Sequence, residues 1–224
     1  MTAPEELPTW RSVLVVVAHP DDESFGLGAV IDALVSRGAS VTVLCLTHGE
    51  ASTLHGSAAD LATLREAELR TAAAALGCLA TVLRDHPDGA LGEVPGAVLV
   101  DDVVTVARRS QSEALLVFDP SGVTGHPDHV AASRAAVRAA GGLGLPVLAW
   151  TLPADVAARL NDEHGGAFSG HRPEEVDLVL DVDRTRQLVA VRAHASQAVP
   201  SSVLWRRLEL LGGLEHLRWI DPTG

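Results

Sequence analysis

The sequence predicts a single doubly wound α/β domain with a Rossmann-like, mostly parallel sheet, and two observations carry that prediction. Short Val-rich apolar runs alternate with longer segments of helical periodicity along most of the chain. The apolar runs are continuous rather than alternating with polar residues, which is typical of strands covered by helices on both faces. A length of 224 residues and a hydrophobic content of 47% fit one domain of this class.

The expected strands leave room for a crossover helix between most successive pairs, as parallel pairing requires. They are the segments 12–18, 40–47, 80–84, 113–118, 146–151 and 176–182. In open sheets of this class, ligands bind beyond the carboxyl ends of the strands, where the strand order reverses. The first and fourth strands are usually neighbours at that point, so residues that follow them should meet.

The expected helices fill the intervals between the strands. Gly38 and Gly77 directly follow two of them, where a left-handed cap is common, and Gly141 with Gly142 is expected to end a third. The loops 48–57, 85–96 and 164–175 are the least regular parts and are expected to rim the site. The predicted helices are 26–37, 58–76, 95–109, 126–140, 153–163, 183–195 and 202–211.

Composition excludes several classes of protein. A net charge of -12 argues against a nucleic-acid or anionic-membrane partner, where a basic surface is expected. Residues 1–10 form an acidic, proline-containing tail that lacks the features of a secretory signal, and no apolar run reaches membrane-spanning length. We therefore expect a soluble, cytoplasmic protein whose domain occupies residues 11–224. Cys45 and Cys78 are expected to be small buried residues rather than functional thiols.

Two polar segments, 19–23 and 125–129, follow the first and fourth expected strands. Either one alone would fit a turn with an Asp at the start of a helix. The expected topology brings both to one edge of the sheet, where His19, Asp22 and His129 supply two imidazoles and a carboxylate. Such a set makes an open zinc site with a fourth position for water, and it also suits ferrous iron. Asp21 could take a proton from that water, which describes a metal-dependent hydrolase.

Other catalytic motifs fit poorly. The Gly26-Leu27-Gly28 run is only a fragment of a dinucleotide-binding loop, because Ile31 stands where a third glycine belongs. Ser24 is not in a nucleophile elbow, since Asp22 stands two positions before it instead of glycine. The chain contains no lysine for a phosphate-binding loop.

On these residues the chain resembles the LmbE-like, or PIG-L, superfamily of zinc-dependent N-deacetylases. The segments 18–23 and 125–129 match its two signature motifs, and the resemblance covers roughly residues 11–200. Two further elements are similar to family patterns, namely Arg65, Glu68, Ala72, Leu76 and Gly77 in one expected helix and His194-Ala195-Ser196-Gln197 near the end.

The resemblance implies a hydrolase that removes an acetyl or other acyl group from an amino-sugar-type amide. It implies His19, Asp22 and His129 as zinc ligands, Asp21 as general base on the metal-bound water, and His126 as general acid and oxyanion stabiliser. These roles agree with the chemistry, because zinc lowers the pKa of bound water to about 7 and a carboxylate can accept its proton. Some members also use a Tyr near the metal, whereas this chain has none.

Three further residues are candidates for binding the substrate. Glu50 matches a family position near the sugar, with a plain loop residue as the alternative. Arg65 either reaches a sugar hydroxyl or pairs with Glu68 one turn away on its helix. Asp88 either accepts a sugar hydroxyl or only makes a turn.

Other polar residues are expected outside the reaction itself. Asp128 either holds the tautomer of a ligand histidine or is an ordinary carboxylate at a helix start. His194 is expected to support the site without binding metal. The remaining loop histidines are expected to face solvent, namely His48, His55, His86, His164 and His171.

The expected partner is a small N-acylated molecule, most simply an amino-sugar conjugate. The alternatives are the amide of a thiol conjugate, an acylated secondary metabolite, and a metal-retaining binding protein without turnover. A carboxyl-terminal apolar set is expected either to form an interface between copies in a homo-oligomer or to complete the core, namely Trp205, Leu208, Leu211 and Trp219.

Overall fold

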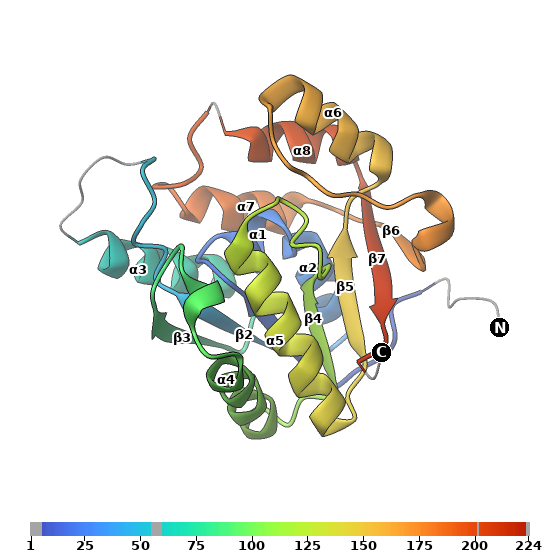
Figure 1. Ribbon diagram of the computed structural model, residues 1–224. Helices are drawn as coiled ribbons and strands as arrows, with labels where there is room; N and C mark the ends of the chain where they lie inside the picture. The colour runs from blue at the N-terminus through green and yellow to red at the C-terminus, as the bar shows by residue number, and fades with distance from the viewer. Residues whose placement is uncertain (1–5, 55–59, 201, 223–224) are drawn as a thin grey trace.

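A computed structural model describes residues 6–54, 60–200 and 202–222, and in them one sheet has the strand order β3-β2-β1-β4-β5-β7-β6 (Figure 1). Strands β1 to β5 run parallel, and β1 lies between β2 and β4. The prediction of a doubly wound, mostly parallel sheet is confirmed. The strands are β1 (Ser12–Val17), β2 (Ser40–Thr47), β3 (Ala80–His86), β4 (Ala114–Phe118), β5 (Val147–Thr151), β6 (Leu178–Asp181) and β7 (Leu214–Ile220).

Helices cover both faces of the sheet (Figure 1). On one face lie α4 (Gly96–Arg109) and α5 (Pro127–Leu143), which pack on each other. The other face carries α1 (Asp22–Phe25), α2 (Gly28–Ser36), α3 (Leu61–Ala75) and α7 (Thr185–Ala193). Two more helices, α6 (Ala154–His164) and α8 (Val203–Leu211), pack together beyond the upper ends of β4 and β5 in Figure 1, and short 3-10 turns occur at Leu91–Glu93 and Pro173–Glu175.

The core has two apolar layers, one on each side of the sheet. Continuous aliphatic strands supply both, since alternate side chains of one strand point to opposite faces. Val15 of β1 lies in the same layer as Leu34 of α2, whereas its neighbour Val16 lies in the layer of Val103 from α4.

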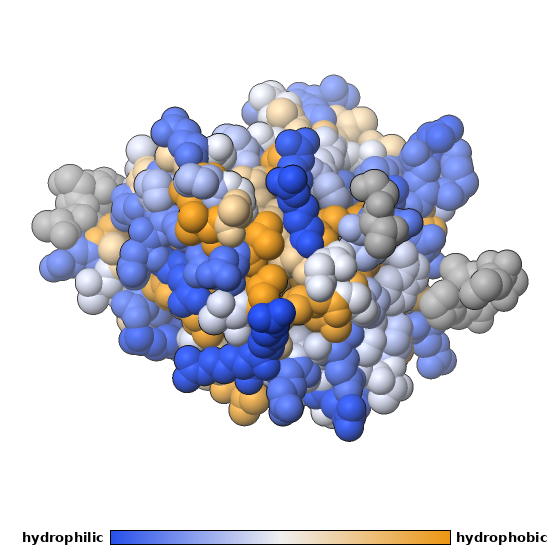
Figure 2. Space-filling view, turned by 60° about the horizontal axis from the view of Figure 1, so that its bottom comes forward, coloured by the Kyte–Doolittle hydropathy of each residue, from blue (hydrophilic) through white to orange (hydrophobic). Residues whose placement is uncertain are grey.

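Figure 2 shows the face at the amino ends of the parallel strands, where apolar side chains are interrupted by hydrophilic ones. None of the described helices is long and apolar enough to cross a membrane.

One strand contradicts the sequence prediction. β7 was not expected, yet it runs antiparallel between β5 and β6. Its sequence lacks a continuous apolar run, because buried Glu215 and Leu217 alternate with partly exposed residues. Glu215 is tolerated there because its carboxylate accepts hydrogen bonds from Arg184 and Trp150.

Helix ends also differ from the prediction at two places. Gly141 and Gly142 lie inside α5, and the helix is capped by Gly144, whose φ of 67° suits a residue without a Cβ. The helix expected at 26–37 is α2 at Gly28–Ser36, and a short helix that was not expected, α1 at Asp22–Phe25, precedes it. The start of the helix expected at 58–76 lies outside the described residues.

Of the carboxyl-terminal apolar set, two leucines are buried in the core, and Trp205 and Trp219 are partly exposed. Leu208 and Leu211 are buried, and the Trp219 ring meets that of Trp10 edge-on at 5.9 Å. Both cysteines are free thiols, with Cys45 buried and Cys78 half-buried. Burial raises the pKa of the Cys78 thiol to about 12 and that of the Cys45 thiol well above its ordinary value. Neither cysteine is therefore a thiolate at neutral pH.

Candidate metal centre and active site

The two polar segments meet at the carboxyl ends of β1 and β4. His19 Nδ1 lies 3.2 Å from His129 Nε2, and the Asp22 carboxylate lies 3.6 Å from the first nitrogen and 3.1 Å from the second. Ligand atoms bound to zinc in a tetrahedron stand about 3.3 Å apart, given zinc–nitrogen bonds of about 2.0–2.1 Å. The three side chains that the sequence singled out are therefore spaced as the ligands of one ion.

Hydrogen bonds behind the two histidines aim their lone pairs at the same point. His129 Nδ1 lies 2.7 Å from Thr124 Oγ1 and 3.3 Å from the Gly122 carbonyl, which can only accept, so Nδ1 carries the proton and Nε2 is free. His19 Nε2 lies 3.0 Å from Asp88 Oδ1 and 3.3 Å from Asp128 Oδ2, which leaves its Nδ1 free. This donor set fits a divalent metal ion.

The electrostatic field around His19 also favours a cation. Burial lowers the pKa of His19, but hydrogen bonds to Asp128, Asp22 and Asp88 raise it well above its ordinary value. Three carboxylates within reach of one buried imidazole therefore create a strongly negative site, which a divalent ion would neutralise.

Asp21 stands beside the ligand Asp22 in a strained conformation. Its φ of 121° is unusual for a residue with a Cβ and costs on the order of 1–3 kcal/mol unless the surroundings hold it. The Asp21 N–H donates to Glu23 Oε2 at 2.9 Å, and its carboxylate lies 3.2 Å from Arg65 Nη2. Burial raises the pKa of Asp21 to about 6, against the lowering effect of Arg65.

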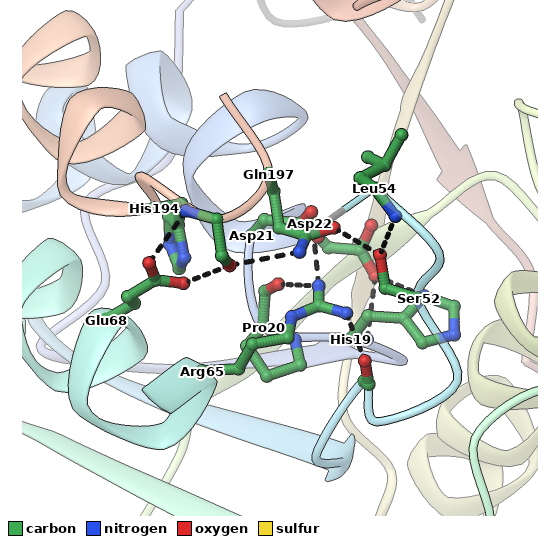
Figure 3. A network of polar contacts seen from close by, with 12 residues as sticks. His19, Pro20, Asp21, Asp22, Ser52, Leu54, Arg65, Glu68, His194 and Gln197 are labelled. Carbon is green, nitrogen blue, oxygen red and sulfur yellow. Dashed lines mark hydrogen bonds and ion pairs between the residues drawn. The ribbon is translucent and has the colours of Figure 1, made fainter. Parts of the chain in front are cut away.

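Arg65 has other partners than those expected. Its guanidinium donates to the Gly49 carbonyl at 2.6 Å and to the Pro20 carbonyl, beside its contact with Asp21 (Figure 3). Only 4% of its side chain is exposed. Glu68 instead accepts hydrogen bonds from Ser196 N and Oγ. Arg65 thus braces Asp21 and two loop carbonyls while it lines the cleft, and Glu68 pairs with Ser196 rather than with Arg65.

His194 lies behind the first segment, on the side of α3 and α7 (Figure 3). Its Nε2 is 2.6 Å from Glu23 Oε1, and both side chains are fully buried. Glu23 also accepts a hydrogen bond from Ser24 Oγ. His194 therefore reaches the site through Glu23, a connection that the sequence argument did not anticipate.

His126 forms the N-cap of α5, and its Nδ1 accepts a hydrogen bond from Asp128 N at 3.2 Å. Since a backbone N–H can only donate, this contact puts the proton of a neutral His126 ring on Nε2. The ring centroid lies 4.7 Å from that of His19 and 5.2 Å from that of His129. Burial and these two imidazoles lower the pKa of His126.

Glu50 and Asp88 join two loops. Glu50 Oε1 accepts a hydrogen bond from Asp88 N at 3.0 Å, and Asp88 Oδ2 accepts one from Ala51 N at 2.8 Å. The other Asp88 oxygen faces His19, and Asp88 also lines the cleft. Asp88 therefore contacts a proposed metal ligand, a contact that the sequence did not predict.

Asp128 is fully engaged beneath the site. Its Oδ2 faces His19 and accepts from Gly89 N at 2.8 Å, and its Oδ1 accepts from Leu91 N at 3.1 Å. Of the two alternatives for Asp128, the structure shows the contact with a candidate ligand histidine.

A cleft of about 620 Å³ opens over these groups. Its floor contains the candidate ligands with Asp21 and His126, and its walls include Phe25, Phe118, Phe168, Leu204 and Arg207. Ser52 Oγ and Gln197 Oε1, which are hydrogen-bonded at 2.9 Å, line its mouth. Sequence reasoning missed Thr124, Ser52 and Arg207 as parts of the site, because nothing in their local sequence marks them.

Three histidines that were expected to face solvent are paired with carboxylates. His48 lies 2.8 Å from Asp85, His86 lies 2.7 Å from Asp102, and His171 lies 3.3 Å from Asp119. His164 is exposed as expected, and His55 lies outside the described residues. These partners come from other segments of the fold, so a loop histidine alone does not indicate exposure.

Comparisons with known proteins agree with this geometry. A family model described as PIG-L, GlcNAc-PI de-N-acetylase, matches residues 14–140. The chain is 35% identical, over 239 aligned positions, to the 1D-myo-inositol 2-acetamido-2-deoxy-alpha-D-glucopyranoside deacetylase of Rhodococcus erythropolis, covering 84% of this chain and 81% of that one. It is 34% identical to the diacetylchitobiose deacetylase of Thermococcus kodakarensis, covering 84% of this chain and 70% of that one.

The fold is also similar to solved structures. The A40926 pseudoaglycone deacetylase superposes with a TM-score of 0.74 at 22% sequence identity, over 97% of this chain and all of that one. At this level of identity, the similarity concerns the fold.

Proposed function

The chain belongs to the PIG-L family of de-N-acetylases, and on this basis we propose that it is a metal-dependent enzyme that removes an acetyl group from an N-acetylglucosamine-type amide. Both curated relatives described above are named for the deacetylation of N-acetylated sugars. The observation that carries the proposal is the convergence of His19, Asp22 and His129 donors within 3.6 Å of one another on the floor of the cleft.

The three converging side chains would hold the metal. Two neutral imidazoles and a carboxylate suit zinc and also ferrous iron, and we propose zinc. When bound, the ion supplies Lewis acidity toward the acyl oxygen and toward water. The protein contributes the orientation of the ligands, through Thr124 behind His129 and through Asp88 and Asp128 behind His19.

Asp21 is the proposed general base. Its carboxylate lines the cleft beside Asp22 and is fixed by Arg65, while Glu23 fixes its backbone. A carboxylate in this position can orient the attacking water and take its proton as the carbon–oxygen bond forms. The contact with Arg65 keeps Asp21 ionised against the effect of burial.

His126 is the proposed general acid. Its Nδ1 is engaged by the Asp128 N–H, so Nε2 is the nitrogen that can donate a proton. In the neutral ring this N–H can donate a hydrogen bond to the negative acyl oxygen. Protonation of the leaving amine nitrogen falls to the imidazolium form of His126, which gives up one proton and returns to the neutral ring. Because the chain has no tyrosine, this role does not fall to a phenol.

The walls of the cleft favour a sugar over a small aliphatic amide. Ser52 and Gln197 at its mouth offer a hydroxyl and an amide to sugar hydroxyls, and Phe168 offers an apolar face to a sugar ring. The thiol-conjugate amide and the acylated secondary metabolite remain the alternatives within the same reaction class.

The test measures acetate release by purified protein of known metal content. N-Acetylglucosamine conjugates should be deacetylated faster than N-acetyl amino acids at matched concentrations, and the Asp21→Asn variant should be inactive on both. Faster release from the amino acids would overturn the sugar assignment. Metal-loaded protein that releases acetate from no amide would support a binding protein without turnover instead.

A further inference from the structure

One of the residues that line the cleft is a buried arginine. Arg207 of α8 lines the cleft and is only 1% exposed. One of its terminal nitrogens donates to the Phe25 carbonyl, and its guanidinium carbon lies 4.9 Å from the centre of the Trp150 ring. Its buried Nε has no hydrogen-bond partner among the described residues. Most of its donor capacity is therefore unused by the protein.

No carboxylate among the described residues forms an ion pair with Arg207. Glu215 lies in the same buried region, but its two oxygens accept hydrogen bonds from Arg184 and from Trp150 Nε1. Burial lowers the pKa of Arg207 to about 10, against the raising effect of Glu215, so the guanidinium remains charged at neutral pH. A charge held away from water without a close counter-ion is costly, and a bound anion would offset that cost.

A chain of ring contacts connects Arg207 to a proposed metal ligand. The ring of Phe118 packs edge-on against His129 at 5.0 Å and lies tilted against Trp150 at 5.0 Å, and the Arg207 guanidinium lies over the same Trp150 ring. Gly26 also lines the cleft, and a Cβ there would come within 2.4 Å of the Phe118 ring. Arg207 therefore shares one cleft with the proposed metal ligands, next to apolar and aromatic side chains.

We propose that Arg207 is a specificity-determining residue that binds a negatively charged oxygen, from a carboxylate or a phosphate group, on the amino-sugar substrate. A guanidinium presents several donors in one plane, which match either anion at two points. By contrast, Arg65 at the same cleft already has Asp21 and two carbonyls as partners. The inference rests on the proposed deacetylase function and narrows its substrate to sugars that carry an anionic group.

The experiment compares kcat/KM for N-acetylglucosamine, its 6-phosphate and N-acetylmuramic acid, which carries a carboxylate. The wild-type protein should prefer at least one anionic sugar. Arg207→Met should lower kcat/KM for that sugar by about 10- to 100-fold, mainly through KM, since a hydrogen bond to a charged group is lost. The loss for the neutral sugar should be clearly smaller, and Arg207→Lys should retain part of the preference.

Arg206→Met is the matched control. Arg206 is the adjacent residue of α8, and its guanidinium pairs with Glu163 and Glu209 outside the cleft. This variant should keep the wild-type ratio between anionic and neutral sugars. Equal loss on all three sugars in Arg207→Met would show a purely structural role and overturn the proposal.

A binding measurement separates this proposal from the proposed function. Glucosamine 6-phosphate and muramic acid should raise the melting temperature of the wild-type protein more than glucosamine does, without any turnover. If no sugar is deacetylated but this difference persists and disappears in Arg207→Met, the anion site stands and the deacetylase function fails. If Arg207→Met does not fold, wild-type protein that binds anionic and neutral sugars equally well would still overturn the proposal.

Discussion

The two segments that form the candidate metal centre are held in place in different ways. Residues 18–23 contain the strained Asp21 and are braced by side chains from distant parts of the chain, namely Arg65 and, through Glu23, His194. In residues 119–129, the partners directly behind His129 are local, namely Thr124 and Gly122, although Asp128 also accepts hydrogen bonds from Gly89 and Leu91 of another loop. The contacts that fix Asp21 therefore come from distant segments, whereas those that fix the His129 tautomer come from its own loop.

His19 is the residue that connects the two segments, so its loss should have the largest effect. His19→Ala removes one of the three proposed ligands and also the partner of Asp88 and Asp128. We expect metal affinity to fall by more than about 100-fold, because loss of a supporting partner alone costs about 10- to 100-fold. Metal analysis after dialysis checks this, and full occupancy in the variant would rule out the ligand assignment.

Asp21→Asn should separate catalysis from metal binding. The amide cannot accept a proton, so turnover should fall by about 10²- to 10⁴-fold while metal content stays near that of the wild type. Asp101→Asn, on the exposed surface of α4, is the matched control and should have no effect. Near-normal turnover in Asp21→Asn would mean that another group is the base. Glu23, the next carboxylate in the same segment, is fully buried and already bonded to Ser24 and His194.

The contrast between the segments also explains how much the sequence could predict. The strands with continuous apolar runs and the meeting of 19–23 with 125–129 follow from local pattern and from the usual strand order of this fold class. β7 was missed because its buried Glu215 breaks the apolar pattern, and it is buried only because Arg184 and Trp150 bind it. Such pairings between distant segments leave no mark in the sequence around either partner.

The contacts of the three substrate candidates could not be predicted for the same reason. Arg65, Glu50 and Asp88 were identified correctly as polar residues near the site, but their partners are backbone groups and side chains of other loops. Which oxygen an arginine reaches depends on packing to within an ångström, and residue type and spacing do not determine that. The meeting of His19, Asp22 and His129 was easier to predict, because His19 and Asp22 closely follow β1 and His129 lies in the first turn of the helix that follows β4.

Glu23→Gln tests the contacts that connect Asp21 to His194, and it should leave the surroundings of His129 unchanged. The new amide places an NH₂ group against either the Asp21 N–H or the donors Ser24 and His194, so one contact is lost. We expect kcat to fall by about 10- to 100-fold, since a small displacement of the base is enough, with metal content and KM little changed.

The stability cost of Glu23→Gln should be about 1–3 kcal/mol, as expected for a buried polar group that loses its partner. Glu66→Gln is the matched control, because Glu66 pairs with Arg70 on the partly exposed side of α3. A large loss of metal from Glu23→Gln would contradict the view that this brace serves Asp21 rather than the ligands.

Thr124→Val tests the local brace of the second segment. The variant removes the hydroxyl 2.7 Å from His129 Nδ1, but the Gly122 carbonyl at 3.3 Å remains as an acceptor. Metal affinity should therefore fall by only about 10-fold, at the low end for a partner of a ligand histidine. Titration with a competing chelator measures it, with Thr71→Val on α3 as control, whose hydroxyl bonds only its own helix. A loss of metal affinity as large as that in His19→Ala would show that the Gly122 carbonyl cannot hold His129 in place without Thr124.

The smallest expected effect is a pH dependence of stability from the buried His194–Glu23 pair. Burial lowers the pKa of His194, but the Glu23 carboxylate, with help from Asp21 and Glu68, raises it above its ordinary value of 6.5. Because the folded pKa is the higher one, the stabilisation is fully present below about pH 6.5 and is lost as pH rises through the folded value. The free energy of unfolding, measured in urea between pH 6 and pH 9, should therefore fall with pH more steeply in the wild type than in His194→Gln. Groups that titrate in both proteins cancel in the difference between their free energies of unfolding. If that difference stays constant from pH 6 to pH 9, the His194–Glu23 pair is not charged in the folded protein.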